Sequence, residues 1–251
     1  MLLSLLKMAE LTLNKILKKF GLQILPRGEN IEGVNLKEIK ILRMVFGYFL
    51  FLLLVWGLYR FLFKFPEDIE EAVLKPLIWL GSLAWVLKKL QKRSLSFLGL
   101  TSKNFFKSLY WGIGLGFLFG LEGLLVNLLK YGRVSLPLVS YAGWEFLTAF
   151  LVSILTGITE ELVFRGFIFN QLFTVWKNEI WANLVTSFLF VLIHLPITIF
   201  ILHYNFAQSL AYGFIVFIYS LGAGFAFART QTIITPILLH IFWSWPIILF
   251  R

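Results

Sequence analysis

The sequence contains no cysteine, few charged residues (14%) and only three histidines among its 251 residues. Without cysteine, the chain cannot use a disulfide, a thiol nucleophile or a cysteine-ligated zinc site. Asp68 is the one aspartate, which excludes a protease that needs two catalytic aspartates. Gly-x-Ser-x-Gly and His-Glu-x-x-His are both missing, so the usual serine-hydrolase and zincin motifs are absent, although a rhomboid-like Ser–His pair stays open.

What the sequence has in abundance is apolar side chains, which make up 59% of the residues. This is far above the average for soluble domains, and it indicates an integral membrane protein. The net charge of +10 does not point to nucleic acid, because lysine and arginine flank the apolar runs. The loop over 88–107 is basic and carries no acid, whereas 66–71 reads "PEDIEE"; the positive-inside rule therefore places the 88–107 loop and the amino terminus in the cytoplasm.

The apolar runs predict an all-α, polytopic transmembrane helix bundle of about seven to eight helices. Residues 1–20 have the pattern of an amphipathic helix lying on the membrane, and residues 21–40 form a polar linker. Residues 41–251 then form the transmembrane domain. A crossing needs about 20 residues, and the expected spans lie near 44–63, 72–87, 106–129, 144–175, 180–202, 207–228 and 231–250.

The third expected span has small residues on one face. Gly112, Gly116 and Gly120 recur at every fourth position, a spacing that lets two helix backbones approach closely. We expect this face to pack within the chain rather than to form a dimer. Glu122, in the same span, has no partner that the sequence identifies.

The stretch "TEELVFRG", 159–166, places Glu160, Glu161 and Arg165 in the long fourth span. A carboxylate at bilayer depth costs about 2.5–3.5 kcal/mol even on a lenient scale, so such residues usually face the protein interior and serve a function. Glu161 and Arg165 are four residues apart with the acid first, which favours an ion pair. Glu160 points about 100° away around the helix, and the pair leaves it free.

Two of the histidines lie well inside apolar spans. If the chain turns at 176–178, Glu160 and His194 are equally far along the chain from Lys177, so an antiparallel hairpin would bring them to the same depth. His240 lies near the middle of the last span. The sequence therefore predicts that Glu160, His194 and His240 line one cavity, open toward the cytoplasm.

These residues also form an ordered set of motifs: Glu160, Glu161 and Arg165, then Phe190 and His194, then His240 with Ser244 four residues later. The pattern resembles the CPBP family, which comprises the CAAX prenyl endopeptidases of Rce1 type and bacterial relatives that include bacteriocin-immunity proteins. The likeness covers about 140–250. Ser244 departs from the pattern, since the family often has asparagine there.

The resemblance implies an intramembrane endopeptidase in a bacterial cell membrane, acting on a peptide or protein substrate at the membrane. Glu160 with His194 fits the role of the base that activates water. His240 and Ser244, on one helical face, could donate hydrogen bonds to the oxyanion. Glu161 and Arg165 would support the helix or contact a substrate carboxylate, and Phe190 belongs to the supporting motif.

Several alternatives stay open at this point. We expect no cofactor and no metal, but Glu160, His194 and His240 are also a His₂Glu set, which is a catalytic zinc stoichiometry. A non-catalytic immunity or adaptor protein is a further possibility. A proton-coupled transporter is disfavoured, because no inverted repeat and no pair of broken helices is visible. The chain contacts lipid and is not expected to bind nucleic acid, and its oligomeric state is open.

Overall fold

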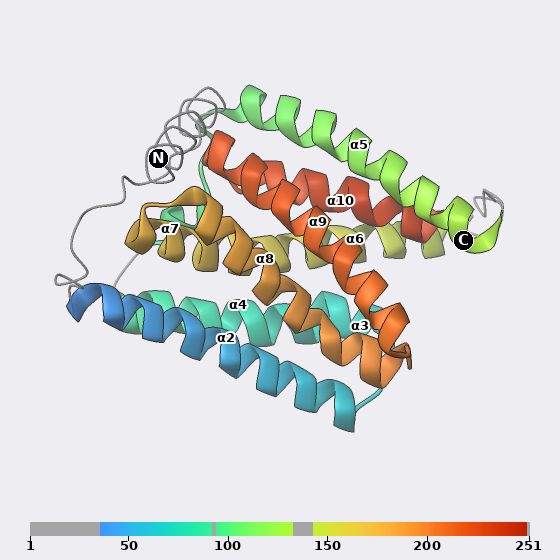
Figure 1. Ribbon diagram of the computed structural model, residues 1–251, viewed down its shortest axis with the longest axis horizontal. Helices are drawn as coiled ribbons and strands as arrows, with labels where there is room; N and C mark the ends of the chain where they lie inside the picture. The colour runs from blue at the N-terminus through green and yellow to red at the C-terminus, as the bar shows by residue number, and fades with distance from the viewer. Residues whose placement is uncertain (1–35, 92–93, 133–142, 250–251) are drawn as a thin grey trace, which may run out of the picture.

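A computed structural model of the chain describes residues 36–91, 94–132 and 143–249, and their regular elements are all helical (Figure 1). The expected amphipathic helix over 1–20 lies outside the described residues. In chain order the elements are α2 (Leu36–Leu62), α3 (Glu67–Ile69), η2 (Glu70–Leu74), α4 (Lys75–Trp85), η3 (Val86–Gln91), η4 (Leu95–Leu98), α5 (Phe105–Tyr131), α6 (Trp144–Glu161), η6 (Leu162–Phe169), α7 (Asn170–Trp176), α8 (Glu179–Pro196), η7 (Ile197–Ile201), α9 (Phe206–Thr230) and α10 (Ile234–Leu249).

Five helices of the described chain are long and apolar enough to cross a membrane. They cover Leu36–Leu62, Phe105–Leu129, Trp144–Trp176, Glu179–Ile201 and Phe206–Thr230. At most 39% of the most apolar window of each is buried inside the protein, so much of their apolar surface is left to face lipid. Helices suit this environment because they satisfy their own backbone hydrogen bonds where water is absent. The protein is therefore an integral membrane protein, and the all-α prediction is confirmed.

The prediction was less accurate at the second and last expected spans. Residues 67–91 form one continuous helical segment that is not among the five spans. The acidic stretch read as a loop is helical from Glu67, and the side chains of Glu70 and Glu71 are buried. The last span appears as a shorter apolar helix, Ile234–Ser244, within α10.

The helices are stacked so that the fourth span lies in the middle. Figure 1 shows α5 and α10 on one side of α6, and α2 and α4 on the other. The turn after α7 falls where the sequence placed it: Lys177 has a left-handed backbone (φ 49°), and the side chain of Asn178 accepts a hydrogen bond from the backbone of Trp181, starting α8. α8 consequently runs back along the fourth span.

The small-residue face of α5 packs against α10. A Cβ atom added at Gly112 would lie 2.9 Å from the Leu238 side chain, and one at Gly116 would lie 2.7 Å from Phe242. Only glycine permits this approach, and the expectation that the face packs within the chain is confirmed.

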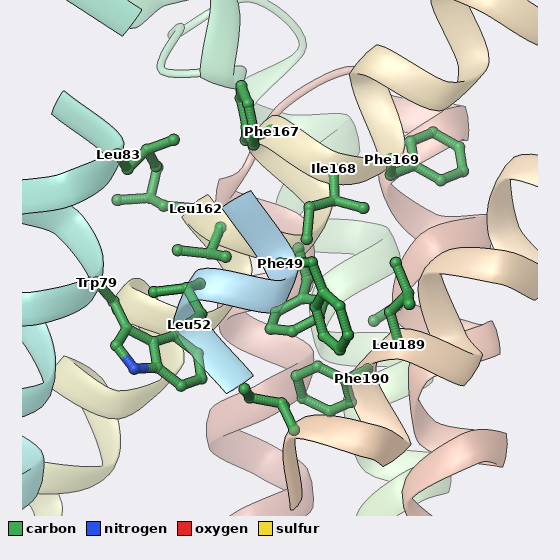
Figure 2. Packing of buried hydrophobic residues seen from close by; sticks show 14 of the residues in the cluster. Phe49, Leu52, Trp79, Leu83, Leu162, Phe167, Ile168, Phe169, Leu189 and Phe190 are labelled. Atoms are coloured by element: carbon green, nitrogen blue, oxygen red, sulfur yellow. The ribbon is translucent and has the colours of Figure 1, made fainter. Parts of the chain in front are cut away.

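Large apolar side chains fill the centre between α2, α4, η6 and α8 (Figure 2). Every residue of η6 is buried, and its π-helical turns are wider than those of an α-helix. Phe164 packs edge-on against Phe190, with ring centroids 4.8 Å apart. This packing fixes η6, which follows directly after Glu160 and Glu161, against α8, which carries His194.

Candidate functional site

A cavity of about 210 Å³ lies among the helices, and Glu160 forms part of its wall. Residues from α2, η2, α4, α6, α8, η7, α9 and α10 line it, so it forms only when the whole bundle is assembled. Its walls combine charged and aromatic side chains: Trp56, Arg60, Glu71, Lys75, Trp79, Val152, Ser153, Thr156, Glu160, Ile193, His194, Ile197, Tyr212, His240, Trp243 and Ser244.

The structure brings Glu160, His194 and His240 together, as the depth argument predicted. Glu160 is the last residue but one of α6 and is only 3% exposed. Its Oε2 atom lies 3.9 Å from Nε2 of His194 and 3.9 Å from Nε2 of His240. Because α8 runs back from the turn at Lys177, equal distance along the chain has become equal depth. The third histidine, His203, is exposed and lies elsewhere.

Hydrogen bonds at the far side of each imidazole fix how the rings face the cavity. Nδ1 of His194 lies 2.7 Å from the backbone oxygen of Phe190, and Nδ1 of His240 lies 2.9 Å from Oε1 of Glu161. Both partners can only accept, so Nδ1 carries the hydrogen in each ring. In the neutral rings, Nε2 therefore turns a lone pair toward Glu160.

The second oxygen of Glu160 contacts a lysine that the sequence analysis did not include in the site. Nζ of Lys75 lies 2.5 Å from Oε1 of Glu160 and 2.6 Å from Oε2 of Glu71. Arg60 bonds the other oxygen of Glu71 at 2.9 Å and also pairs with Glu70. We call these five residues, Arg60, Glu70, Glu71, Lys75 and Glu160, the Glu160 cluster.

A sequence signal for this cluster existed. Glu71 and Lys75 have the same four-residue spacing as Glu161 and Arg165, and Lys75 lies inside an apolar helix. A charged residue in such a position is a functional candidate by default.

Glu161 belongs to a separate group on a different face of the helix. Its Oε1 atom accepts hydrogen bonds from Nη1 of Arg165 at 2.9 Å and from the Tyr219 hydroxyl at 2.8 Å, and it is also the partner of His240. The predicted Glu161–Arg165 pair is thus confirmed. We call Glu161, Arg165, Tyr219 and His240 the Glu161 cluster.

Arg165 is fully buried, and aromatic rings surround its guanidinium. The guanidinium carbon lies 4.6 Å from the ring centroid of Phe190 and 5.6 Å from that of Tyr219, and Nη2 donates to the Ser220 hydroxyl at 2.8 Å. With every side of Arg165 enclosed by protein, the role of holding the helix fits it better than contact with a substrate. Phe190 supports both this arginine and, through its backbone oxygen, His194.

Ser244 lines the cavity but already has partners. Its hydroxyl lies 3.1 Å from the backbone oxygen of Ile241 and 3.0 Å from the hydroxyl of Ser153. If Ser244 donates to Ile241, Ser153 donates to Ser244, and both hydroxyl hydrogens are used. In the described part of the chain neither serine bonds a cavity histidine, so the arrangement does not support a Ser–His nucleophile.

The sequence identified no partner for Glu122, but the structure shows one. The indole nitrogen of Trp243 donates to its Oε2 at 3.2 Å. The ring of Trp243 stacks on Tyr219 with centroids 4.3 Å apart. Glu122 therefore acts on the cavity wall through Trp243 rather than as a member of the site.

The residues do not fit a zinc ion. Two ligands on one tetrahedral zinc lie about 3.4 Å apart, because each lies about 2.0–2.1 Å from the metal, whereas both histidine nitrogens lie 3.9 Å from Glu160. The Lys75 ammonium also holds Oε1 of the same carboxylate, so only Oε2 faces the histidines. Over residues 36–91, 94–132 and 143–249, no group of three His, Cys, Asp or Glu side chains is arranged to hold a metal.

Comparison with known families matches residues 142–246 to the type II CAAX prenyl endopeptidase family described as Rce1-like. The match covers fewer than half of the 251 residues, and we call residues 142–246 the Rce1-like domain. This match confirms the resemblance read from the motifs, and the matched family is one of proteases. No curated protein and no solved structure gives a significant match.

The limits of the Rce1-like domain divide the site. The domain contains all the residues that the sequence analysis selected: Glu160, Glu161, Arg165, Phe190, His194, His240 and Ser244. Arg60, Glu71 and Lys75 precede it by tens of residues, yet they form one wall of the same cavity. The site is therefore completed by helices outside the matched domain.

Proposed function

We propose that the protein is an intramembrane endopeptidase in which Glu160 activates a water molecule to hydrolyse a peptide bond. The observation that carries the proposal is the free Oε2 atom of Glu160, which faces the Nε2 atoms of His194 and His240 in a cavity among membrane helices. A buried carboxylate with one unbonded oxygen beside two imidazoles is the arrangement expected of a general base.

The roles follow from the hydrogen positions. A water between the groups donates one hydrogen bond to Oε2 of Glu160 and the other to the lone pair on Nε2 of His194. These two bonds direct a lone pair of the water oxygen at the substrate carbonyl. Glu160 takes a proton as the water oxygen bonds to the carbonyl carbon. The same proton passes to the leaving nitrogen as the C–N bond breaks, which returns Glu160 to its starting state.

His240 has a different role in this proposal. Its Nδ1–H donates to the Glu161 carboxylate at 2.9 Å, which fixes the ring with Nε2 toward the cavity. A protonated His240 presents Nε2–H to the cavity and can donate to the oxyanion of the tetrahedral intermediate. Ser244 contributes a second donor only if its hydroxyl leaves Ile241, so we assign the main oxyanion role to His240.

The substrate and the setting extend the proposal. The cavity lies within helices that cross the membrane, so we propose a peptide or protein substrate that is itself associated with the membrane. In this proposal the amino terminus lies in the cytoplasm and the protein lies in a bacterial cell membrane. The proposed mechanism uses no metal, because Glu160 itself takes the proton from water.

The proposal is tested with purified protein in lipid nanodiscs and a membrane-anchored peptide library read by mass spectrometry. Glu160→Gln keeps the shape of the side chain but removes the base, and general bases contribute roughly 10²–10⁴-fold to turnover. We expect cleavage by the wild type, loss of that order in Glu160→Gln, and no effect of a strong chelator. Peptide bound but left intact by the wild type would support an immunity or adaptor role instead.

A further inference from the structure

The two oxygens of the Glu160 carboxylate have different surroundings. Oε1 lies 2.5 Å from Nζ of Lys75, while Oε2 faces the two histidines without a close contact. A carboxylate that is free to rotate would exchange these oxygens. A strong contact on one of them removes that freedom and leaves the other directed at the imidazoles.

Lys75 is itself held in one position. Its Nζ atom bonds Oε2 of Glu71 at 2.6 Å, and the hydroxyl of Thr156 donates to the same oxygen at 2.9 Å. Thr156 lies one turn before Glu160 on α6, so this contact ties α6 to the segment that carries Lys75. On its other side, the ammonium lies 5.1 Å from the ring centroid of Trp79.

Burial makes the contact strong. Lys75 is 4% exposed and Glu160 is 3% exposed. Charge-assisted hydrogen bonds are shorter and about twice as strong as neutral ones, and in a low-dielectric interior there is little water to compete for either group.

We propose that Lys75 is a positioning residue for the hydrolytic reaction: it fixes the Glu160 carboxylate so that Oε2 is the oxygen that takes the proton from water. The proposal rests on the proposed function of Glu160. It assigns a role to a residue outside the Rce1-like domain, and it makes the helical segment 67–91 part of the reactive centre rather than only a packing element.

The charge balance decides which variants can test this role. The Glu160 cluster holds two cations, Arg60 and Lys75, and three carboxylates, so removal of Lys75 alone leaves three acids with one arginine. Such a variant is expected to fold poorly. Glu71→Gln combined with Lys75→Met removes one charge of each sign, leaves Arg60 with Glu70, and takes the ammonium away from Glu160.

The experiment compares wild type, Glu71→Gln and the double variant Glu71→Gln/Lys75→Met, as full-length protein in nanodiscs, for thermal unfolding, kcat and KM. Misplacement of a catalytic group by about 1 Å can cost about 10²-fold, so we expect kcat of the double variant to fall by that order with KM unchanged. Glu71→Gln alone keeps the Lys75–Glu160 contact and should retain at least about tenfold more turnover than the double variant.

A matched control and a rescue complete the test. Glu179→Gln/Arg229→Met removes another ion pair, whose atoms lie 2.9 Å apart outside the cavity, and should leave kcat unchanged. The charge-balanced variant Glu71→Gln/Lys75→Ala should regain turnover when methylammonium is added, because the removed ammonium borders the cavity. A merely structural lysine predicts neither the rescue nor a fall in kcat at constant KM.

Wild-type kcat in a folded double variant would overturn the role of Lys75. So would a Glu71→Gln/Lys75→Ala protein that is folded and inactive and gains nothing from methylammonium. Failure of the proposed function looks different: the wild type and Glu160→Gln would then cleave the library equally, or not at all.

Discussion

Glu160 and Glu161 are neighbours in the chain, and both are buried, but the clusters around them differ. Glu161 receives Arg165, Tyr219 and His240 on one oxygen, all of them from the Rce1-like domain. Glu160 contacts Lys75 on one oxygen and keeps the other toward the cavity. The difference shows that the two acids have separate tasks: one holds the helices and a histidine in place, and the other is available for proton transfer.

Helix geometry produces this separation. Adjacent residues point about 100° apart, so one acid at the end of α6 faces the cavity while the next faces the interior toward α9 and α10. A single change to either acid therefore tests one cluster and leaves most of the other in place.

The largest effect on stability is expected from Glu161→Gln. Arg165 is fully buried, and removing one member of a buried ion pair typically costs about 3–5 kcal/mol. Thermal unfolding in nanodiscs, followed by tryptophan fluorescence, should show this loss together with reduced activity, because His240 loses its charged partner. Glu160→Gln should lose activity with a much smaller change in stability, since Lys75 keeps Glu71.

A double variant sharpens this comparison. Glu161→Gln/Arg165→Met removes both charges, so part of the lost stability should return, whereas activity should not, because His240 still lacks its carboxylate. Equal stability of the two glutamine variants would contradict the division of tasks between the clusters.

The part of the site that lies on one hairpin could be predicted from the sequence. Glu160 and His194 meet because a turn fixes the relative depth of two adjacent helices, and the Glu161–Arg165 pair follows from a four-residue spacing within one helix. Both are local geometry. His240 lies on a separate helix, and the resemblance to a family supplied the reason to place it in the cavity.

The Lys75 contact could not be predicted in the same way. It joins segments 85 residues apart, and no turn links their depths directly. Composition also misled, since the acids of 66–71 suggested a loop in water, whereas Glu70 and Glu71 are buried because Arg60 and Lys75 compensate their charges. Charge compensation between distant helices is a tertiary property that hydropathy along the chain does not report.

A smaller effect is expected from Tyr219→Phe, which removes one donor from Glu161. The phenylalanine ring keeps the stacking on Trp243, so the change isolates the hydroxyl. Hydrogen bonds to charged groups contribute about 1.5–3 kcal/mol, and unfolding should report a loss in that range.

Tyr48→Phe is the matched control. The Tyr48 hydroxyl is also buried but donates to a neutral acceptor, the backbone oxygen of Trp79, at 2.8 Å. Its loss should cost about 0.5–1.5 kcal/mol. If Tyr219→Phe and Tyr48→Phe lose the same stability, the charge of the Glu161 carboxylate does not strengthen its hydrogen bond to Tyr219.

The smallest effect is expected from Ser244→Ala, which tests whether Ser244 takes part in the reaction or only lines the cavity. The serine hydroxyl bonds Ile241 and Ser153 and not a histidine, so its loss should cost about 1 kcal/mol or less. Loss of an oxyanion donor in other proteases lowers turnover by about 10²–10³-fold, and we expect a fall far below that range, because His240 carries the main oxyanion role. Single-turnover rates for wild type, Ser244→Ala and Ser153→Ala provide the measurement. A fall of the full oxyanion size in Ser244→Ala alone, with substrate binding unchanged and Ser244→Asn active, would instead place Ser244 beside His240 at the reacting carbonyl.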